Sequence, residues 1–525
     1  MADLAGTWQV LRHILHRDRW VLPLWLLGTW TLATSRALSI ATVYPDEAAR
    51  RLRYDAVMSD VPMFKLFQGP AYGDSAAALV AQESVAGGTL LAALWACLLV
   101  VRHTRAEEQA GRTELARAGV VGRHAHLAAA LTEVLGAAVL LAVLVAATMA
   151  AAGLPVTGSV VFGLVLGAAA AIGAGLAAVA AQVTANPRLA AWGAFLLFFA
   201  LHFVRGIGDL AGGSAARAVW AVPNAWLQRT RPFADERWWP FGLVLVLVVV
   251  LVVVAFRLSA RRDLAAAVVA PRPGPDGAEE WVRGPIAMAW RQHRTALLVW
   301  VAALSAVTIP SGFGGTAAME SYATSDLMAE WAAAMGTGDP ADAFFAYIVF
   351  TMVFPVTIYA MATALRVVGE ERSGLAETVL ARPTTRLAWA GGHLLVAASV
   401  PVVLELVIGL GFGIGSGQLG TMLRTTMVLV PAVWVMVGVA VAAFGLVPRL
   451  AAVLPWLVFA VALTGELGQH LGWPRWTFLV TSPFSHVMPF YGPPSAGTVL
   501  ALMLLAAGLT AAGLVGLRRR DLVTS

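Results

Sequence analysis

The sequence contains one acidic motif twice. Its first copy is Glu107-Glu108-x-x-Gly111-x-x-Glu114, followed by Arg123. The second copy, offset by 263 residues throughout, is Glu370-Glu371-x-x-Gly374-x-x-Glu377, followed by Arg386. Residues spaced i, i+4 and i+7 share one face of an α-helix, so each copy predicts a helix face that carries two carboxylates and a glycine. Because glycine costs roughly 1 kcal/mol in a helix interior, we expect another backbone or side chain to pack closely against that face.

Such an acidic face could dock into a basic groove on a partner protein. The alternative is a solvated loop helix whose acids make ordinary i,i+4 pairs with neighbouring bases. A plain loop has no reason to keep the same pattern twice, so the duplication favours a partner-coupling role. We therefore treat both copies, with Arg123 and Arg386, as a candidate site for coupling to a partner.

A second group of candidate residues consists of polar side chains within apolar segments. They are Glu133, Glu405, Glu466 and His470, of which the last two are spaced i, i+4. Charges at membrane depth are costly and usually face a bundle interior or a cavity. These residues could contact a cationic or polar substrate or relay protons, and ordinary hydrogen bonding between helices is the alternative. Glu133 and Glu405 do not coincide under the offset of 263, so neither belongs to the duplicated motif.

The composition predicts that most of the protein surface faces lipid. Of the 525 residues, 59% are hydrophobic and 13% are charged, whereas a soluble domain has roughly 25% charged residues. Apolar stretches of about 20 residues, the length that spans a bilayer, recur along the whole chain. They are continuous and do not alternate apolar with polar residues, so we expect an all-α integral membrane protein and not a β-barrel.

We expect about twelve transmembrane helices in two sets of six. The first set is predicted near 20–40, 77–101, 127–152, 157–182, 189–208 and 240–257. The second set is predicted near 295–311, 343–365, 388–413, 421–447, 450–472 and 496–517. The stretch 242–256 has no polar side chain, so we expect this part of the sixth helix to face lipid.

A further match indicates that the two sets arose by duplication of a six-span unit. Arg261-Arg262-Asp263-Leu264 follows the first set, and Arg519-Arg520-Asp521-Leu522 follows the second. An even number of spans gives both halves the same orientation, as parallel repeats about an axis along the membrane normal. The predicted organisation is a first half at 1–270, a cytoplasmic linker at 271–285 and a second half at 286–525.

Shorter elements are expected outside the spans. Residues 5–19 and 286–294 could each form an amphipathic helix at the inner surface, ahead of the first span of their half. The outer loop at about 41–76 is expected to carry further short helices. The alternating glycines from Gly409 to Gly417 and the pair Gly163 and Gly167 are interpreted as close helix packing and not as a phosphate cradle.

The distribution of basic residues predicts the orientation. With a cytoplasmic N-terminus, 24 of the 36 Lys and Arg residues fall in cytoplasmic segments, as the positive-inside rule requires. Both termini are then cytoplasmic. This topology also explains the net charge of +6, so we do not expect nucleic acid as a partner.

Several kinds of chemistry are excluded. Cys97 is the only cysteine, so the chain has no disulfide framework or thiolate metal cluster, and we predict no metal site. The only lysine, Lys65, follows Val-Pro-Met-Phe and is not part of a phosphate-binding G-x-x-x-x-G-K-[ST] loop. The chain is therefore expected to be neither an ATPase nor another enzyme, with no cofactor of its own.

The acidic pair, glycine, glutamate and following arginine resemble the coupling-helix region of type-2 ATP-binding-cassette exporter permeases. The single-chain, twelve-span form is similar to actinobacterial permeases linked to antibiotic and multidrug export, including the tetronasin and polyketide exporters. The resemblance covers nearly the whole chain, although few residues carry it. It implies that the two coupling segments sit in clefts on two copies of an ATPase subunit, which binds the ATP and magnesium, at the bacterial inner membrane.

The leading hypothesis is therefore a permease subunit that exports hydrophobic or amphipathic compounds, energised by separate ATPase subunits. A proton-coupled secondary transporter using one of the embedded glutamates is the runner-up, but it leaves the duplicated motif unexplained. A lipid or envelope-glycoconjugate exporter would share the architecture with a different cargo. A non-transporting scaffold or sensor is a third class.

Overall fold

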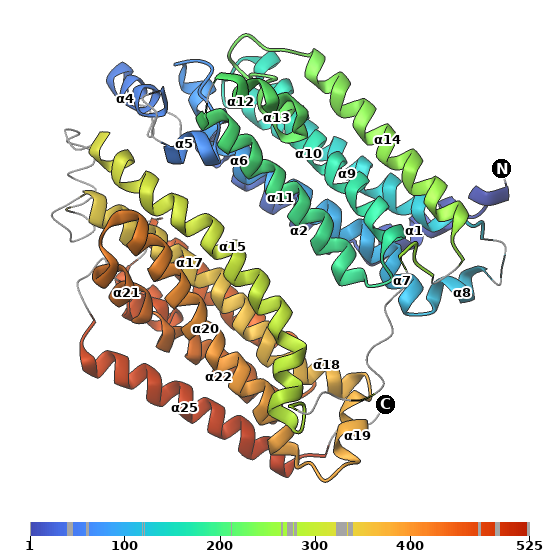
Figure 1. Ribbon diagram of the computed structural model, residues 1–525, viewed down its shortest axis with the longest axis vertical. Coiled ribbons are helices and arrows are strands. Elements are labelled where there is room, and N and C mark those ends of the chain that lie inside the picture. The colour runs from blue at the N-terminus through green and yellow to red at the C-terminus, as the bar shows by residue number, and fades with distance from the viewer. Residues whose placement is uncertain are drawn as a thin grey trace. The chain divides into compact units, whose positions relative to one another are not determined.

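The computed structural model divides the chain into two compact helical units, Met1–Gly274 and Pro275–Ser525 (Figure 1). Every element within the described part of the chain is a helix. The structure describes residues 2–38, 46–58, 62–117, 119, 121–211, 213–263, 266–269, 277, 281–321, 333, 340–470, 474–488 and 494–521.

The first unit contains six helices that correspond to the first predicted set of spans. They are α2 (Val21–Leu38), α6 (Ala76–His103), α9 (Ala125–Ala151), α10 (Val156–Val183), α11 (Pro187–Ala211) and α14 (Trp239–Arg261). Shorter helices lie at the two ends of this bundle: α1 (Thr7–Arg17), α4 (Glu47–Met58), α5 (Pro62–Phe67), α7 (Arg105–Gln109), α8 (Arg112–Arg117), α12 (Gly213–Ala218) and α13 (Pro223–Gln228). The outer loop at 41–76 thus carries short helices, α4 and α5, as predicted.

The second unit follows the same order. Its long helices are α15 (Pro285–Ser321), α17 (Pro340–Ala364), α20 (Arg386–Ser416), α22 (Val430–Leu446), α23 (Leu454–His470) and α25 (Ala496–Arg519). Its shorter helices are α18 (Arg366–Arg372), α19 (Leu375–Leu380), α21 (Leu419–Met427) and α24 (Arg475–Thr481).

The pattern of contacts between long helices within the first unit is repeated within the second. In the first unit α9 packs on α2 and α6, and α10 packs on α6 and α14. In the second unit α20 packs on α15 and α17, and α22 packs on α17 and α25. Each unit therefore brings its first and third long helices together, and its fourth against its second and sixth.

Ten helices in the described part of the chain are long and apolar enough to cross a membrane. Two of the twelve predicted spans, 20–40 and 450–472, are not among these ten. α2 covers the first of them but carries Arg36 in its last turn. The apolar part of α23, Leu454–Glu466, is shorter than the other candidates. The finding is thus a multi-pass helical membrane protein with ten candidate spans.

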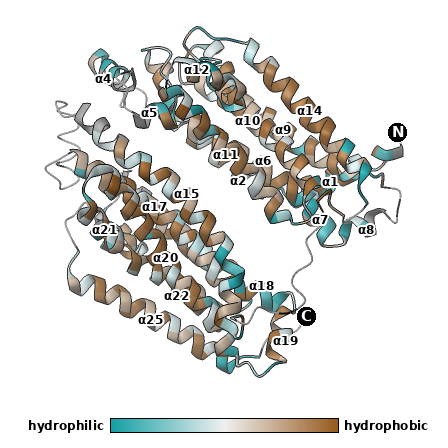
Figure 2. Cartoon of the chain, viewed as in Figure 1, coloured by the Kyte–Doolittle hydropathy of each residue, from teal (hydrophilic) through white to brown (hydrophobic). Residues whose placement is uncertain are grey.

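The sixth long helix of each unit is its most exposed candidate span. Within their apolar windows, 11% of α14 and 17% of α25 are buried, compared with 78% for the span formed by α21 and α22. Figure 2 shows α14 as mostly hydrophobic and α25 as hydrophobic with pale bands between. Exposed valines and leucines along these helices are suited to lipid. The helix satisfies its own backbone hydrogen bonds, and these side chains have no polar group that would need a partner in the bilayer. The exposure of α14 agrees with the prediction for residues 242–256, and their contact with lipid stays a prediction.

The segments ahead of the first spans differ between the units. α1 is amphipathic, as predicted, and buries Leu11 and Ile14 against Ala129 of α9. The prediction of a separate short helix at 286–294 is wrong, because these residues form the beginning of the continuous helix α15.

Close helix packing explains the glycine patterns, as predicted. A Cβ on Gly411 would lie 2.0 Å from Oγ1 of Thr308, and one on Gly415 would lie 2.4 Å from the backbone nitrogen of Phe313. On α10, a Cβ at Gly163 would lie 2.3 Å from the carbonyl oxygen of Ala142. These glycines let α20 approach α15, and α10 approach α9, more closely than any side chain would allow.

Candidate functional site

Each acidic motif lies at one end of its unit, where two short helices meet at a left-handed glycine. In the first unit α7 ends at Gln109, α8 begins at Arg112, and Gly111 between them has φ +70°. In the second unit α18 and α19 are separated by Gly374, with φ +74°. The prediction of one continuous helix face is therefore wrong, since the chain turns at each glycine. We call this end the motif end of each unit.

The glycine of the motif is required by its backbone conformation and not by close packing. Only glycine adopts a positive φ without a steric penalty. A Cβ on Gly111 would meet no atom within 4 Å outside its immediate neighbours. The expectation of a closely packed neighbour is thus incorrect at Gly111, where the missing side chain permits the turn.

The second glutamate of each motif forms a bidentate ion pair with the second arginine of the repeated Arg-Arg-Asp-Leu sequence. Arg262 donates from Nη1 and Nη2 to the carboxylate of Glu108 over 2.8 and 2.6 Å. Arg520 donates in the same way to Glu371 over 2.6 and 2.7 Å. The two sequence repeats, recognised separately, therefore meet in space in both units.

The motif arginine joins the same contact. Arg123 donates to the carbonyl oxygen of Arg262, and Arg386 donates to that of Arg520, each over 2.6 Å. We call Glu108, Arg123 and Arg262 the first ion-pair cluster, and Glu371, Arg386 and Arg520 the second ion-pair cluster. Each cluster connects the short helix after the second span with the beginning of the third and the end of the sixth.

The end of the fourth long helix also contacts each cluster. Arg262 donates from Nε to Oε1 of Gln182 over 2.7 Å. The guanidinium carbon of Arg520 lies 4.7 Å from the ring centroid of Phe444, a cation–π contact. The ends of the third, fourth and sixth long helices of each unit, and the short helix that follows the second, thus meet at one arginine.

The pairs are largely removed from solvent. The side chains of Glu108 and Arg262 are each 8% exposed, and those of Glu371 and Arg520 are 6% and 13% exposed. Removing one partner of a buried pair leaves an uncompensated charge, which typically costs about 3–5 kcal/mol. These glutamates therefore hold each unit together internally, and they are not part of an acidic surface open to a partner.

The first glutamate of each motif is also buried, but its partners differ between the units. Glu107 accepts hydrogen bonds from Arg17 of α1 and Arg112 of α8, with shortest distances of 2.6 Å. Glu370 instead accepts a hydrogen bond from the indole of Trp389 over 2.9 Å, and its Oε2 lies 3.3 Å from Nε2 of His393.

The last glutamate of each motif is the one that faces outward. Glu114 on α8 and Glu377 on α19 are both exposed. Leu375 beside Glu377 is exposed as well, whereas Ala376 is buried beneath the helix. Figure 2 shows the hydrophilic residues of α7, α8 and α18 gathered where the hydrophobic helices end. Glu114 and Glu377 are therefore the motif glutamates at the surface, each on a short helix next to a buried cluster.

The embedded acids lie in different surroundings. Glu133 is two turns into α9, at the motif end of the first unit, with its Oε2 3.5 Å from Nε2 of His103. Glu405 lies within α20 and is fully buried, and neither of its oxygens has a hydrogen-bond partner among the described residues. Glu466 accepts a hydrogen bond from Ser485 over 2.6 Å. The i, i+4 spacing of Glu466 and His470 would allow the two side chains to pair, but such a pair falls outside the described residues, because the side chain of His470 is not described.

Sequence reasoning missed a buried arginine at the opposite end of the first unit. Arg205 of α11 is 0% exposed and donates to Asp209 and Gln228 over 3.0 and 2.9 Å. It also donates to the carbonyl oxygen of Leu66 over 2.6 Å, so it ties α5 and α13 to α11. An Arg and an Asp spaced i, i+4 inside an apolar helix are the sequence signal that could have identified it.

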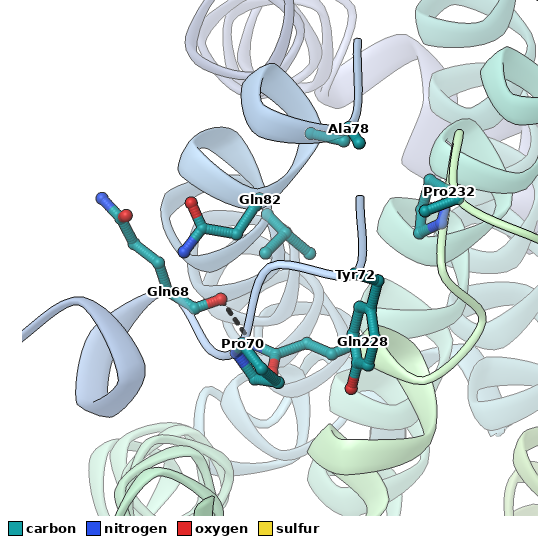
Figure 3. A pocket seen from close by; sticks show the side chains of 10 residues that line it. Gln68, Pro70, Tyr72, Ala78, Gln82, Gln228 and Pro232 are labelled. Carbon is teal, nitrogen blue, oxygen red and sulfur yellow. Dashed lines mark hydrogen bonds between the residues drawn. The ribbon is translucent and has the colours of Figure 1, made fainter. Parts of the chain in front are cut away.

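A small cavity lies beside this arginine network. Its volume is about 30 Å³, and Figure 3 shows Gln68, Tyr72 and Gln228 among the residues that line it. This is room for one or two water molecules and not for a drug-sized compound. Burial raises the pKa of Tyr72 above its usual value of 10.0, so its hydroxyl stays protonated at neutral pH. The cavity is therefore not a substrate site.

Comparison with known proteins identifies the family. The chain is 36% identical over 536 residues to the multidrug efflux system permease protein Rv1217c of Mycobacterium tuberculosis (strain ATCC 25618 / H37Rv), and the match covers 99% of this chain and 96% of the relative. A family model for the C-terminal domain of that permease also matches residues 282–518. This chain belongs to the multidrug efflux permease family.

The residues that the family model matches include most of the candidate site in the second unit. Residues 282–518 contain α18, α19 and Arg386. The narrower resemblance to type-2 ATP-binding-cassette permeases and to the tetronasin exporters stays a prediction.

The left-handed glycine can be tested by substitution in the purified permease. We expect Gly374→Ala to lower the free energy of unfolding by about 1–2 kcal/mol, because alanine is strained at a φ of +74°. Gly369→Ala is the matched control: this glycine lies inside α18 with no atom near a new Cβ, so alanine should raise stability by about 0.5–1 kcal/mol. Thermal unfolding in detergent measures both. Equal effects at the two positions would refute the conformational explanation.

The second ion-pair cluster gives a further prediction. Arg520→Met removes one partner of a buried pair, so we expect it to destabilise the permease by about 3–5 kcal/mol. Arg519→Met provides the control at an exposed neighbouring position and should change stability by less than about 0.5 kcal/mol. Adding Glu371→Gln to Arg520→Met should recover part of the loss, because no buried charge is then left unpaired. Similar melting temperatures for R520M and R519M would contradict this assignment.

Proposed function

We propose that this permease is the membrane-spanning subunit of an ATP-driven exporter of hydrophobic or amphipathic compounds, including drugs. Two copies of a separate ATP-binding-cassette ATPase subunit bind and hydrolyse ATP with magnesium. The observation that carries the proposal is the repeated arrangement at the motif ends, where an exposed short helix rests on a buried ion pair. Membership of the multidrug efflux permease family supports the drug cargo.

The geometry is suited to transmitting force from a partner. A displacement of α8 is transmitted to α6 through α7. It is transmitted to α9 and α14 through Arg123 and Arg262 of the first ion-pair cluster. The second cluster gives α19 the same connections to α17, α20 and α25. ATP binding on the partner can shift the membrane conformation only if the two states of the permease bind the ATPase with different affinity. Because buried pairs hold α8 and α19 to several spans, a rearrangement of the spans also moves the docking surface, and the two states then bind the ATPase with different affinity.

The proposed topology places both motif ends in the cytoplasm of a bacterium, with the permease in the inner membrane. The charge distribution supports this orientation, because the basic residues concentrate in the segments at the motif ends. α2 and α23 complete twelve spans, as two parallel six-span repeats with both termini cytoplasmic.

Reversing the exposed charges tests the coupling surface. We expect Glu114→Lys together with Glu377→Lys to reduce the ATPase activity that co-purifies with the tagged permease by at least about tenfold, because like charges facing a basic cleft cost several kcal/mol. The matched control is Asp74→Lys with Asp342→Lys, which reverses two exposed acids just before or within the first turns of α6 and α17, at the opposite ends of the units.

Membranes from the native host, solubilised and purified through a tag on the permease, supply the material for this measurement. Drug-stimulated ATP hydrolysis is recorded for each variant alongside the amount of folded permease. If the Glu114 and Glu377 variant retains the activity of the wild type, α8 and α19 are not the docking surface. If the control variant loses as much, the effect is not specific to the motif ends.

A proton-coupled transporter is the second candidate function. It is favoured by the buried carboxyl group of Glu405, for which the described residues offer no hydrogen-bond partner. Glutamine keeps the shape of this side chain and removes its titratable proton. For an ATP-driven exporter we expect Glu405→Gln to retain dye export within about threefold of the wild type, a change of less than 1 kcal/mol. Inverted vesicles energised either with ATP or with a pH gradient make the comparison. Transport that needs only the gradient and is lost in E405Q would establish the second candidate.

A further inference from the structure

Three titratable side chains from distant parts of the sequence meet at the motif end of the first unit. Asp18 caps the C-terminus of α1, and His103 is the last residue of α6. Glu133 lies two turns into α9. All three are buried, with exposures of 0%, 1% and 4%. One ligand atom from each lies within 4.8 Å of the other two.

The spacing of these atoms is close to that of a metal site. Nε2 of His103 lies 2.8 Å from Oδ2 of Asp18 and 3.5 Å from Oε2 of Glu133. Tetrahedral zinc with bonds of 2.0–2.1 Å holds its ligand atoms about 3.3 Å apart. Nε2 of His103 and Oδ2 of Asp18 share a hydrogen bond in this structure, so an ion held by all three atoms would replace that hydrogen bond and widen the separation of the two atoms by about 0.5 Å. An imidazole with two carboxylates is a ligand set that suits zinc and its neighbours among the divalent transition metals.

The carboxylate of Glu133 provides an independent indication of a missing ligand. Neither of its oxygens has a hydrogen-bond partner among the described residues, although the side chain is buried and directed at His103. A buried carboxylate without a hydrogen bond or full charge compensation is costly. A cation bound between Glu133, His103 and Asp18 would remove that cost.

We propose that Asp18, His103 and Glu133 form a binding site for one divalent transition-metal ion, with Zn²⁺ as the ion that its ligands fit best. Arg102 orients the site from one side, because its Nη2 lies 3.0 Å from Oδ1 of Asp18 and leaves Oδ2 for the ion. The three protein ligands leave the fourth tetrahedral position for water. The bound ion joins α1, α6 and α9 at the point from which α7 and α8 extend.

The second unit shows why the site is confined to the first. At the motif end of the second unit, Nε2 of His293 lies 3.3 Å from Nδ1 of His393, whose Nε2 lies 3.3 Å from Oε2 of Glu370. His293 and Glu370 therefore contact opposite nitrogens of the His393 ring, so the three groups do not converge on one point that an ion could occupy. Glu370 also already accepts a hydrogen bond from Trp389. Among the described residues, Asp18, His103 and Glu133 are the one group with the geometry to hold an ion.

Metal analysis of the full-length permease tests the proposal. Protein purified with a tag that contains no histidine is stripped with a chelator, incubated with Zn²⁺, desalted and analysed for bound metal. We expect about one Zn²⁺ per wild-type chain, and at least about tenfold weaker binding in Glu133→Gln and His103→Gln, because each removes a direct ligand. His393→Gln is the matched control from the second unit and should bind zinc as the wild type does.

Two further readouts separate loss of the site from loss of folding. Zn²⁺ should raise the melting temperature of the wild type and of H393Q but not of E133Q, since a ligand stabilises only the protein that binds it. Replacing zinc by Co²⁺ should give the visible absorption of a tetrahedral site in the wild type and H393Q alone. The proposal is overturned if the wild type binds no stoichiometric zinc, or if E133Q and H103Q, eluting as folded protein, bind it equally well.

Discussion

The pairing of Glu108 with Arg262, and of Glu371 with Arg520, is the interaction on which the rest of the motif ends depends. A six-residue helix such as α8 or α19 is too short to be stable alone, so its position is set by the contacts at its base. At each base a left-handed glycine turns the chain, and a buried bidentate pair fixes the turn to the end of the last long helix. The outward-facing surface is therefore only as well placed as the ion pair beneath it.

The two ion-pair clusters connect the same helices in both units, even though the other contacts of the motif differ. In the first unit α1 joins the motif through Arg17, whereas in the second Trp389 and His393 hold the first glutamate. What is common is that one arginine contacts the short helix, the beginning of the third long helix and the end of the fourth. A partner that moves α8 or α19 thus acts on several spans at once. Packed helices with buried pairs between them shift as bodies and do not deform continuously.

The sequence predicted the helices well, since a backbone in lipid must form its hydrogen bonds internally and long apolar stretches leave little choice. The prediction of one continuous helix was wrong at Gly111, because the helical spacing of the motif residues does not reveal that this glycine has a positive φ. Both repeats were visible, but nothing in their spacing showed that Arg262 binds Glu108, because side chains 154 residues apart are brought together only by helix packing. Asp18, His103 and Glu133 follow no sequence pattern for the same reason. The exposure of Glu114 agrees with the predicted docking face, whereas the burial of Glu107 and Glu108 could be seen only in the structure.

A charge swap in the second ion-pair cluster tests the central claim most directly. The permease is reconstituted with the proposed ATPase subunit, and drug-stimulated ATP hydrolysis is measured for Glu371→Arg, Arg520→Glu and the double variant. If the pair transmits movement from α19 to the membrane helices, each single reversal abolishes the stimulation and the double variant restores much of it, while hydrolysis without drug is retained throughout. Full stimulation in either folded single variant would contradict the account.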